Sequence, residues 1–155
     1  MTKDVFVSVS GLQYAMDDSN PVEVLSPGTY YLRDGKKYIR YEEFIDPADS
    51  AAETVSPEWK VSNTIKIDGD KIDLIKRGAV EVQMSFEPGQ KYVTYYNTPF
   101  GKLLLGLHTS SVEVVEEEGY LGVQIDYSLD INYAHTSDCR IQIDVRPKNR
   151  WKVEE

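Results

Sequence analysis

Hydrophobic and polar residues alternate strictly from Gly119 to Tyr133, the strongest pattern in the chain. Successive side chains of a β-strand point to opposite faces, so this alternation predicts a strand with one buried and one solvated face. The residues expected on the buried face are Leu121, Val123, Ile125, Tyr127, Leu129, Ile131 and Tyr133. At about 3.3 Å per residue, such a strand is roughly twice the usual length. It has to bend or coil, as strands do when a sheet closes into a barrel.

Shorter alternating runs fill most of the remaining chain, and turn residues separate them. Near the two ends, the side chains expected to point inward are Val5, Val7, Val9, Ile141, Ile143 and Val145. Asp34-Gly35 and Asp68-Gly69 predict hairpins, because glycine accepts the positive φ of a tight turn. Further turns are expected at residues 88–89, 98–101, 118–119 and 135–138, and Gly106 predicts a bend or bulge within a strand. The runs therefore predict an all-β fold, a single antiparallel barrel of about eight to ten strands.

One long connection, at residues 46–57, interrupts this series, and it contains a candidate short helix at Pro47–Glu53. The chain of 155 residues suits a single β-barrel domain over residues 1–155.

Composition narrows the classes of partner and compartment. The net charge of −9 argues against binding to nucleic acid or to an anionic membrane surface, since both require a basic face. No apolar run is long enough to cross a bilayer, and the alternating N-terminus does not resemble a signal peptide. The single cysteine, Cys139, cannot form an internal disulfide. We therefore expect a cytoplasmic protein.

No catalytic or cofactor motif is recognisable. The two histidines, His108 and His135, lack companions at zinc-ligand spacing, and Asp68-Gly69-Asp70 is too short for a calcium loop. Nucleophile-elbow, P-loop and dinucleotide glycine patterns are absent from the sequence. We expect no metal, no cofactor and no catalytic residue. An enzyme would need one of the histidines among other titratable groups in a cleft at the barrel mouth.

Several short motifs, taken in order and spacing, resemble the YwiB-like family, known as domain of unknown function 1934. They are Tyr38–Glu43, Thr64–Ile67, Lys76–Gly78, Met84–Phe86, Tyr96–Gly101 and Ile125–Leu129, within a match from about Lys3 to Val145. The resemblance implies a small bacterial protein with a calycin-like (lipocalin-type) β-barrel. It brings no established activity and no recognised catalytic residues.

Such a barrel is either filled by side chains or holds one small ligand. The leading hypothesis is non-catalytic binding of a small apolar or amphipathic ligand, because the chain has 11 tyrosines, many of them in strands. The residues expected to line or gate the mouth are Arg77, Tyr96, Phe100 and Tyr127. An inward Arg77 would hold a carboxylate or phosphate, whereas an outward one would pair with surface carboxylates. Strand alternation favours the outward orientation.

The alternative hypothesis is an interaction or regulatory protein with a packed barrel and an acidic outer face. Glu113 and Glu116-Glu117-Glu118 form the acidic stretch, which would either attract a basic partner or protect a solvated edge strand. We expect a monomer or a symmetric dimer.

Overall fold

The computed structural model describes residues 2–11, 23–44, 60–98 and 101–148. The predicted loop at 46–57, its candidate helix, and Phe100 lie outside these residues. Ten strands make up the described fold: β1 Thr2–Ser10, β2 Glu23–Arg33, β3 Lys36–Phe44, β4 Lys60–Asp68, β5 Lys71–Gly78, β6 Val82–Phe86, β7 Lys91–Thr98, β8 Gly101–Glu117, β9 Tyr120–Ile131 and β10 Ala134–Pro147.

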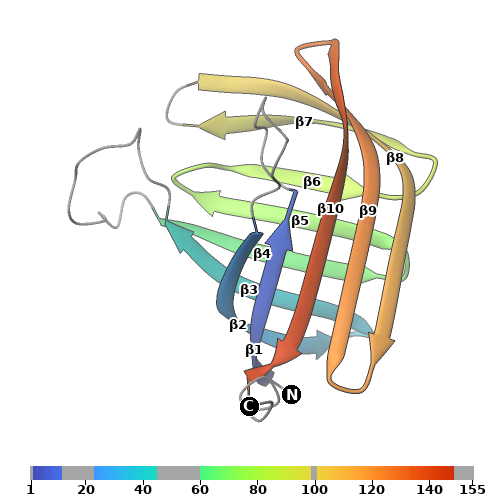
Figure 1. Ribbon diagram of the computed structural model, residues 1–155. Helices are drawn as coiled ribbons and strands as arrows, with labels where there is room; N and C mark the ends of the chain where they lie inside the picture. The colour runs from blue at the N-terminus through green and yellow to red at the C-terminus, as the bar shows by residue number, and fades with distance from the viewer. Residues whose placement is uncertain (1, 12–22, 45–59, 99–100, 149–155) are drawn as a thin grey trace.

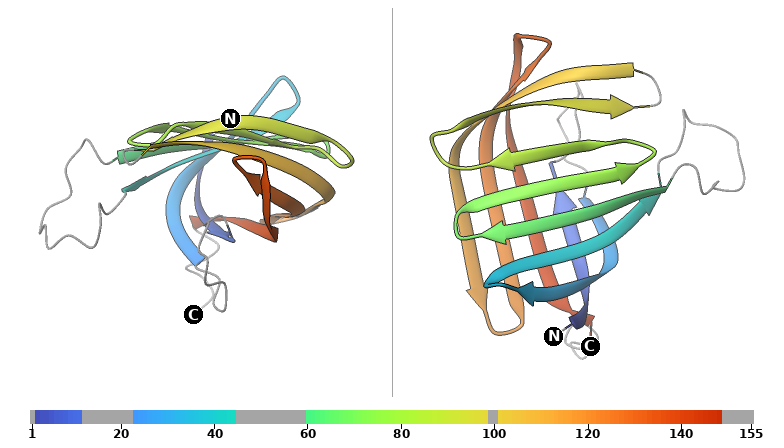
Figure 2. Two further views of the ribbon diagram at one scale, coloured as in Figure 1. Left: turned by 90° about the horizontal axis from the view of Figure 1, so that it is seen from above. Right: turned by 180° about the vertical axis from the view of Figure 1, so that it is seen from behind.

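The strands form one antiparallel sheet that curls into a nearly closed barrel, which confirms the predicted architecture. Their order is β6-β5-β4-β3-β2-β1-β10-β9-β8-β7, so neighbours in the sheet are neighbours in sequence except where β1 meets β10. Strands β3 to β7 lie across β1 and β8 to β10, and the two groups form the two walls (Figures 1 and 2).

Closure between β6 and β7 is slight. Glu81 and Asn97 exchange two backbone hydrogen bonds of 2.9 Å at one end of the seam. At the other end, the Gly89 amide donates to the Thr109 carbonyl at 2.9 Å, and the Thr109 amide donates to the Gln90 carbonyl at 3.1 Å. No ladder joins β6 to β7 between these points in the described part of the chain.

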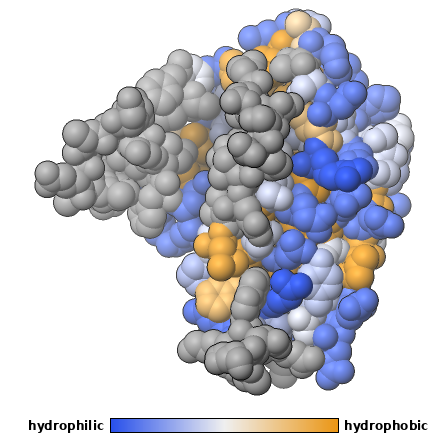
Figure 3. Space-filling model, viewed as in Figure 1, coloured by the Kyte–Doolittle hydropathy of each residue, from blue (hydrophilic) through white to orange (hydrophobic). Residues whose placement is uncertain are grey.

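The inner faces of the strands meet in one hydrophobic core. Val5, Val7 and Val9 of β1 and Ile141, Ile143 and Val145 of β10 are buried, as their alternation predicts. In the middle of the barrel, the rings of Phe86 and Tyr127 meet edge to face with centroids 5.0 Å apart. On the side shown in Figure 3, hydrophobic residues reach the surface in small separate groups within a mostly hydrophilic face.

The Asp34-Gly35 hairpin is confirmed, with positive φ angles of 54° and 78° at its two turn residues. The end of the long strand was predicted wrongly. Strand β9 stops at Ile131, and Asn132 and Tyr133 form the turn with φ of 51° and 74°, so Tyr133 is 88% exposed instead of inward. Residues 135–138, predicted as a turn, belong to β10 and contain an irregularity in its pairing between His135 and Ser137.

The predicted irregularity at Gly106 is also displaced. Gly106 pairs regularly with Asp130 and Val93, whereas the register shift in β8 lies between Thr109 and Ser111. A β-bulge adds one residue to one strand, and every later side chain of that strand then changes face. Leu105 and Leu107 point inward before the bulge, and Val112 and Val114 are the residues packed on the core after it.

Candidate functional site

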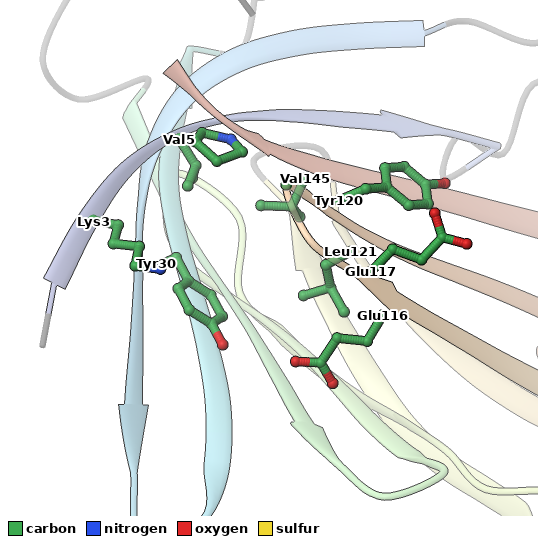
Figure 4. A pocket seen from close by; sticks show the side chains of 10 residues that line it. Lys3, Val5, Tyr30, Glu116, Glu117, Tyr120, Leu121 and Val145 are labelled. Atoms are coloured by element: carbon green, nitrogen blue, oxygen red, sulfur yellow. The ribbon is translucent and has the colours of Figure 1, made fainter. Parts of the chain in front are cut away.

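A hollow of about 130 Å³ opens at the end of the barrel where β1 starts and β10 ends. Its floor is apolar and comes from Val5, Leu121 and Val145, which are buried residues of three adjacent strands. Lys3 and Tyr30 line one side, and Glu116 and Glu117 line the other (Figure 4). The hollow therefore combines an apolar base with a polar rim.

The bulge in β8 directs Glu116 into this hollow. Glu116 pairs with Leu121, an inward residue of β9, so the two side chains share the inner face. Glu117, the next residue, points the other way, and in Figure 4 its carboxylate lies away from the hollow beside Tyr120. The acidic stretch was predicted as one outer face or edge, but its side chains point to both faces of the sheet. Strand β8 also lies between β7 and β9 and is therefore not an edge strand.

An ion pair crosses the barrel at this mouth. Lys37 Nζ of β3 lies 3.2 Å from Glu116 Oε1 of β8, two strands that are not neighbours in the sheet. The Lys37 side chain is 22% exposed and the Glu116 side chain 57% exposed. In Figure 4 the Tyr30 hydroxyl and the Glu116 carboxylate extend into the same space from opposite walls.

Tyr30 responds to both charges of this pair. Partial burial raises the pKa of its hydroxyl, the Lys37 ammonium lowers it, and the Glu116 carboxylate raises it again. The net result is a pKa above the ordinary value, so Tyr30 remains a protonated hydrogen-bond donor at neutral pH.

Tyr120 stabilises the outer wall beside the hollow through three contacts. Its hydroxyl donates a hydrogen bond to Asp144 Oδ1, and the Arg146 guanidinium lies 4.8 Å from its ring centroid. The ring covers Gly122, where any side chain would collide with it. The hydrogen bond to Asp144 is the main reason that the pKa of Tyr120 is raised. These contacts fix the start of β9, and with it Leu121.

A second polar group lies on the inner wall at the opposite end of the barrel. Lys76 Nζ donates to Glu43 Oε1 and to Asn63 Oδ1, and Asn63 Nδ2 donates to Glu43 Oε1, each at 2.8 Å. Lys76 and Asn63 are buried, and the Glu43 side chain is 32% exposed. We call these three residues the inner polar cluster.

Two tyrosines lie within electrostatic reach of the inner polar cluster. Burial raises the pKa of Tyr41 and of Tyr96, and the negative charge of Glu43 raises both further. Tyr96, on β7, is half-buried against the core, and Asn97 beside it joins Glu81 across the seam. The cluster and both tyrosines thus meet around one end of the barrel.

The four residues predicted to line the mouth are not brought together. Tyr96 faces inward at the end that holds the inner polar cluster, and Arg77 lies on the outer face of β5, as strand alternation favours. Lys76, its neighbour, is the inward cation. Tyr127 is 5% exposed and packs deep in the core against Phe86. Phe100 is outside the described residues.

The hollow itself was not predicted. Its key residues, Lys37 and Glu116, stand at the ends of alternating runs, where charged residues are usually solvated. The signal for Glu116 was present, because the apolar positions change from odd numbers at Leu103, Leu105 and Leu107 to even numbers at Val112 and Val114. That change of phase indicates one extra residue between them.

The histidines lie on the outer surface. His135 Nδ1 is 3.6 Å from Asp130 Oδ1, and Asp130 is also 3.6 Å from Lys91 Nζ. Within the described ranges, no three His, Cys, Asp or Glu side chains are grouped to hold a metal ion. The same residues contain no helix with the length and apolarity needed to span a membrane.

Comparison with known proteins places the chain in a family. It is 26% identical over 129 residues to the uncharacterized β-barrel protein YwiB of Bacillus subtilis (strain 168), a match that covers 81% of this chain and 83% of that protein. The crystal structure of the Bacillus subtilis ywiB protein matches 94% of this chain and 92% of its own, with a TM-score of 0.73 at 23% identity. That likeness supports the same barrel fold. The family model described as domain of unknown function (DUF1934) matches residues 7–143, and the chain therefore belongs to this family.

Proposed function

We propose that this protein binds a small amphipathic molecule without transforming it, and that the hollow at the barrel mouth is the binding site. The observation that carries this proposal is the division of the hollow into an apolar floor and a polar rim (Figure 4). Ligand sites combine these two features, because the apolar surface supplies affinity and a few polar groups fix orientation.

The packing of the barrel supports a site at the mouth instead of the centre. Phe86 and Tyr127 meet in the middle, and large side chains around them are fully buried. A volume of about 130 Å³ is below the roughly 300–1,000 Å³ of sites for drug-sized ligands. The proposed occupant is correspondingly small.

Native mass spectrometry of gently purified protein, followed by extraction under denaturing conditions, tests the proposal. We expect a stoichiometric small molecule that leaves when the protein unfolds. Leu121→Trp, which fills the floor of the hollow, should lose it, provided that circular dichroism shows a folded barrel. Val115→Trp is the matched control, because Val115 is 42% exposed on the outer face. An unliganded mass for the unaltered protein, repeated after incubation with cell extract, would overturn the proposal.

The packed core also supports a second candidate, an interaction protein that uses its acidic outer surface. Glu113 and Glu118 are exposed and lie outside the hollow, whereas Glu116 and Glu117 line it. Reversing the charge of Glu113 and Glu118 should remove a basic partner from a pull-down. An unchanged set of captured proteins would exclude this surface as the docking site. For both functions we propose a cytoplasmic location, consistent with a single, half-buried cysteine, Cys139.

A further inference from the structure

The polar side of the hollow holds an unpaired cation, although the protein has a net charge of −9. Lys3 lines the hollow without an ion-pair partner among the described residues. Lys37 is neutralised by Glu116, and the second lining carboxylate, Glu117, extends toward Tyr120 (Figure 4). An unpaired ammonium group favours an anionic ligand, because the rest of the acidic surface repels anions.

The Lys37–Glu116 pair is unequally exposed. The Lys37 side chain is 22% exposed, so its ammonium is the less solvated member of the pair and gains more from a negative partner. Glu116 is 57% exposed, so its carboxylate can return to water at small cost. Another anion can therefore replace Glu116 beside Lys37.

Tyr30 supplies the second contact that an incoming anion needs. Its hydroxyl stays protonated and extends toward Glu116 from the opposite wall (Figure 4). A hydroxyl donor beside an ammonium group is a suitable arrangement for the two oxygens of a carboxylate, since hydrogen bonds to charged acceptors are the stronger ones. Glu116 itself shows that a carboxylate fits against Lys37.

We infer that the ligand is a small carboxylate with an apolar body, and that its carboxylate takes the place of Glu116 against Lys37. Lys3 and the Tyr30 hydroxyl then face the same head group, and the apolar body rests on Val5, Leu121 and Val145. Glu116 acts as an internal competitor for the site. This inference rests on the proposed function and specifies the chemical class of its ligand.

Three probes of matched size test the ligand class by isothermal titration calorimetry: phenylacetate, phenethyl alcohol and phenethylamine. We expect phenylacetate to bind at least about tenfold more tightly than the other two, which corresponds to about one charge-assisted contact. In Lys37→Met this preference should disappear while circular dichroism shows a folded barrel.

Two variants on β8 test the exchange itself. Glu116→Gln should strengthen phenylacetate binding by about threefold, because it removes the competing carboxylate. Glu113→Gln makes the same change of charge at an exposed position of the same strand that does not line the hollow, and it should leave the affinity within about 1.5-fold. This comparison does not depend on the stability of Lys37→Met.

The outcomes distinguish the carboxylate class and the exchange with Glu116 from the proposed ligand-binding function. Equal affinity for all three probes overturns the carboxylate class while the proposed ligand function stands. Weaker phenylacetate binding in Glu116→Gln, or equal gains in both glutamine variants, overturns the exchange. Binding of none of the probes, together with an unliganded native mass, overturns the carboxylate inference and the proposed function together.

Discussion

Replacing Lys76 by methionine removes the centre of the inner polar cluster and keeps the side chain close in length. Lys76 donates 2.8 Å hydrogen bonds to Glu43 and Asn63, and its own side chain is 11% exposed. Asn63, which is 4% exposed, would then have a buried amide oxygen without the Lys76 donor, a loss of about 1–3 kcal/mol. Glu43 is one-third exposed and can be rehydrated, so we assign about 1 kcal/mol to its lost partner. The free energy of unfolding should fall by about 2–4 kcal/mol in total.

Urea denaturation followed by far-ultraviolet circular dichroism measures this change, and a double-mutant cycle with Glu43→Gln isolates the pair. We expect a coupling energy of about 1–2 kcal/mol between Lys76 and Glu43. Arg77→Met is the matched control, since Arg77 is the next residue and lies on the exposed face, and it should stay within about 0.5 kcal/mol. A loss no larger for Lys76→Met than for Arg77→Met would refute the reasoning, as would additive effects in the cycle.

Three further measurements test other parts of the fold. Burial strongly raises the pKa of Tyr41, so its hydroxyl loses the proton at lower pH in the unfolded chain than in the folded protein. The free energy of unfolding should therefore be unchanged below about pH 10 and fall above it. Tyr41→Phe should reduce this fall in denaturation experiments from about pH 9 to 11. The buried hydroxyl of Thr109 has no hydrogen-bond partner among the described residues. Thr109→Val should therefore raise the free energy of unfolding by about 1 kcal/mol. A comparable decrease would show that the hydroxyl makes a hydrogen bond in the folded protein. Tyr133 is exposed and has a positive φ, which glycine adopts more easily than tyrosine. Tyr133→Gly should therefore raise the melting temperature. A lower melting temperature would mean that the tyrosine ring makes a stabilising contact.

The strands were predictable because burial on one face leaves a period of two in the sequence. Val5, Val7 and Val9 and the run from Leu121 to Ile131 show this directly. The same rule failed at Tyr133, because a polar residue followed by an apolar one also fits a two-residue turn, and only the backbone angles distinguish the two.

The candidate site was less accessible to prediction because it joins strands that are distant in the sheet. Lys37 and Glu116 meet across the barrel, and no local pattern indicates which residues of a closed sheet face each other. The inner polar cluster was missed for a related reason. A lysine beside an arginine, at Lys76 and Arg77, gives no sign of which cation points inward unless the strand phase is known.

The slight closure between β6 and β7 gives the barrel a preferred line of opening. Two backbone hydrogen bonds between Glu81 and Asn97 hold one end of this seam, whereas the shortest ladder elsewhere, β5 with β6, joins five residue pairs. Opening of the seam at this end breaks these two hydrogen bonds and no ladder, so we expect it to require less free energy than global unfolding. The protein is therefore a rolled sheet whose two margins are joined by the turn at residues 87–90 and come together at the far end through a single pair of residues.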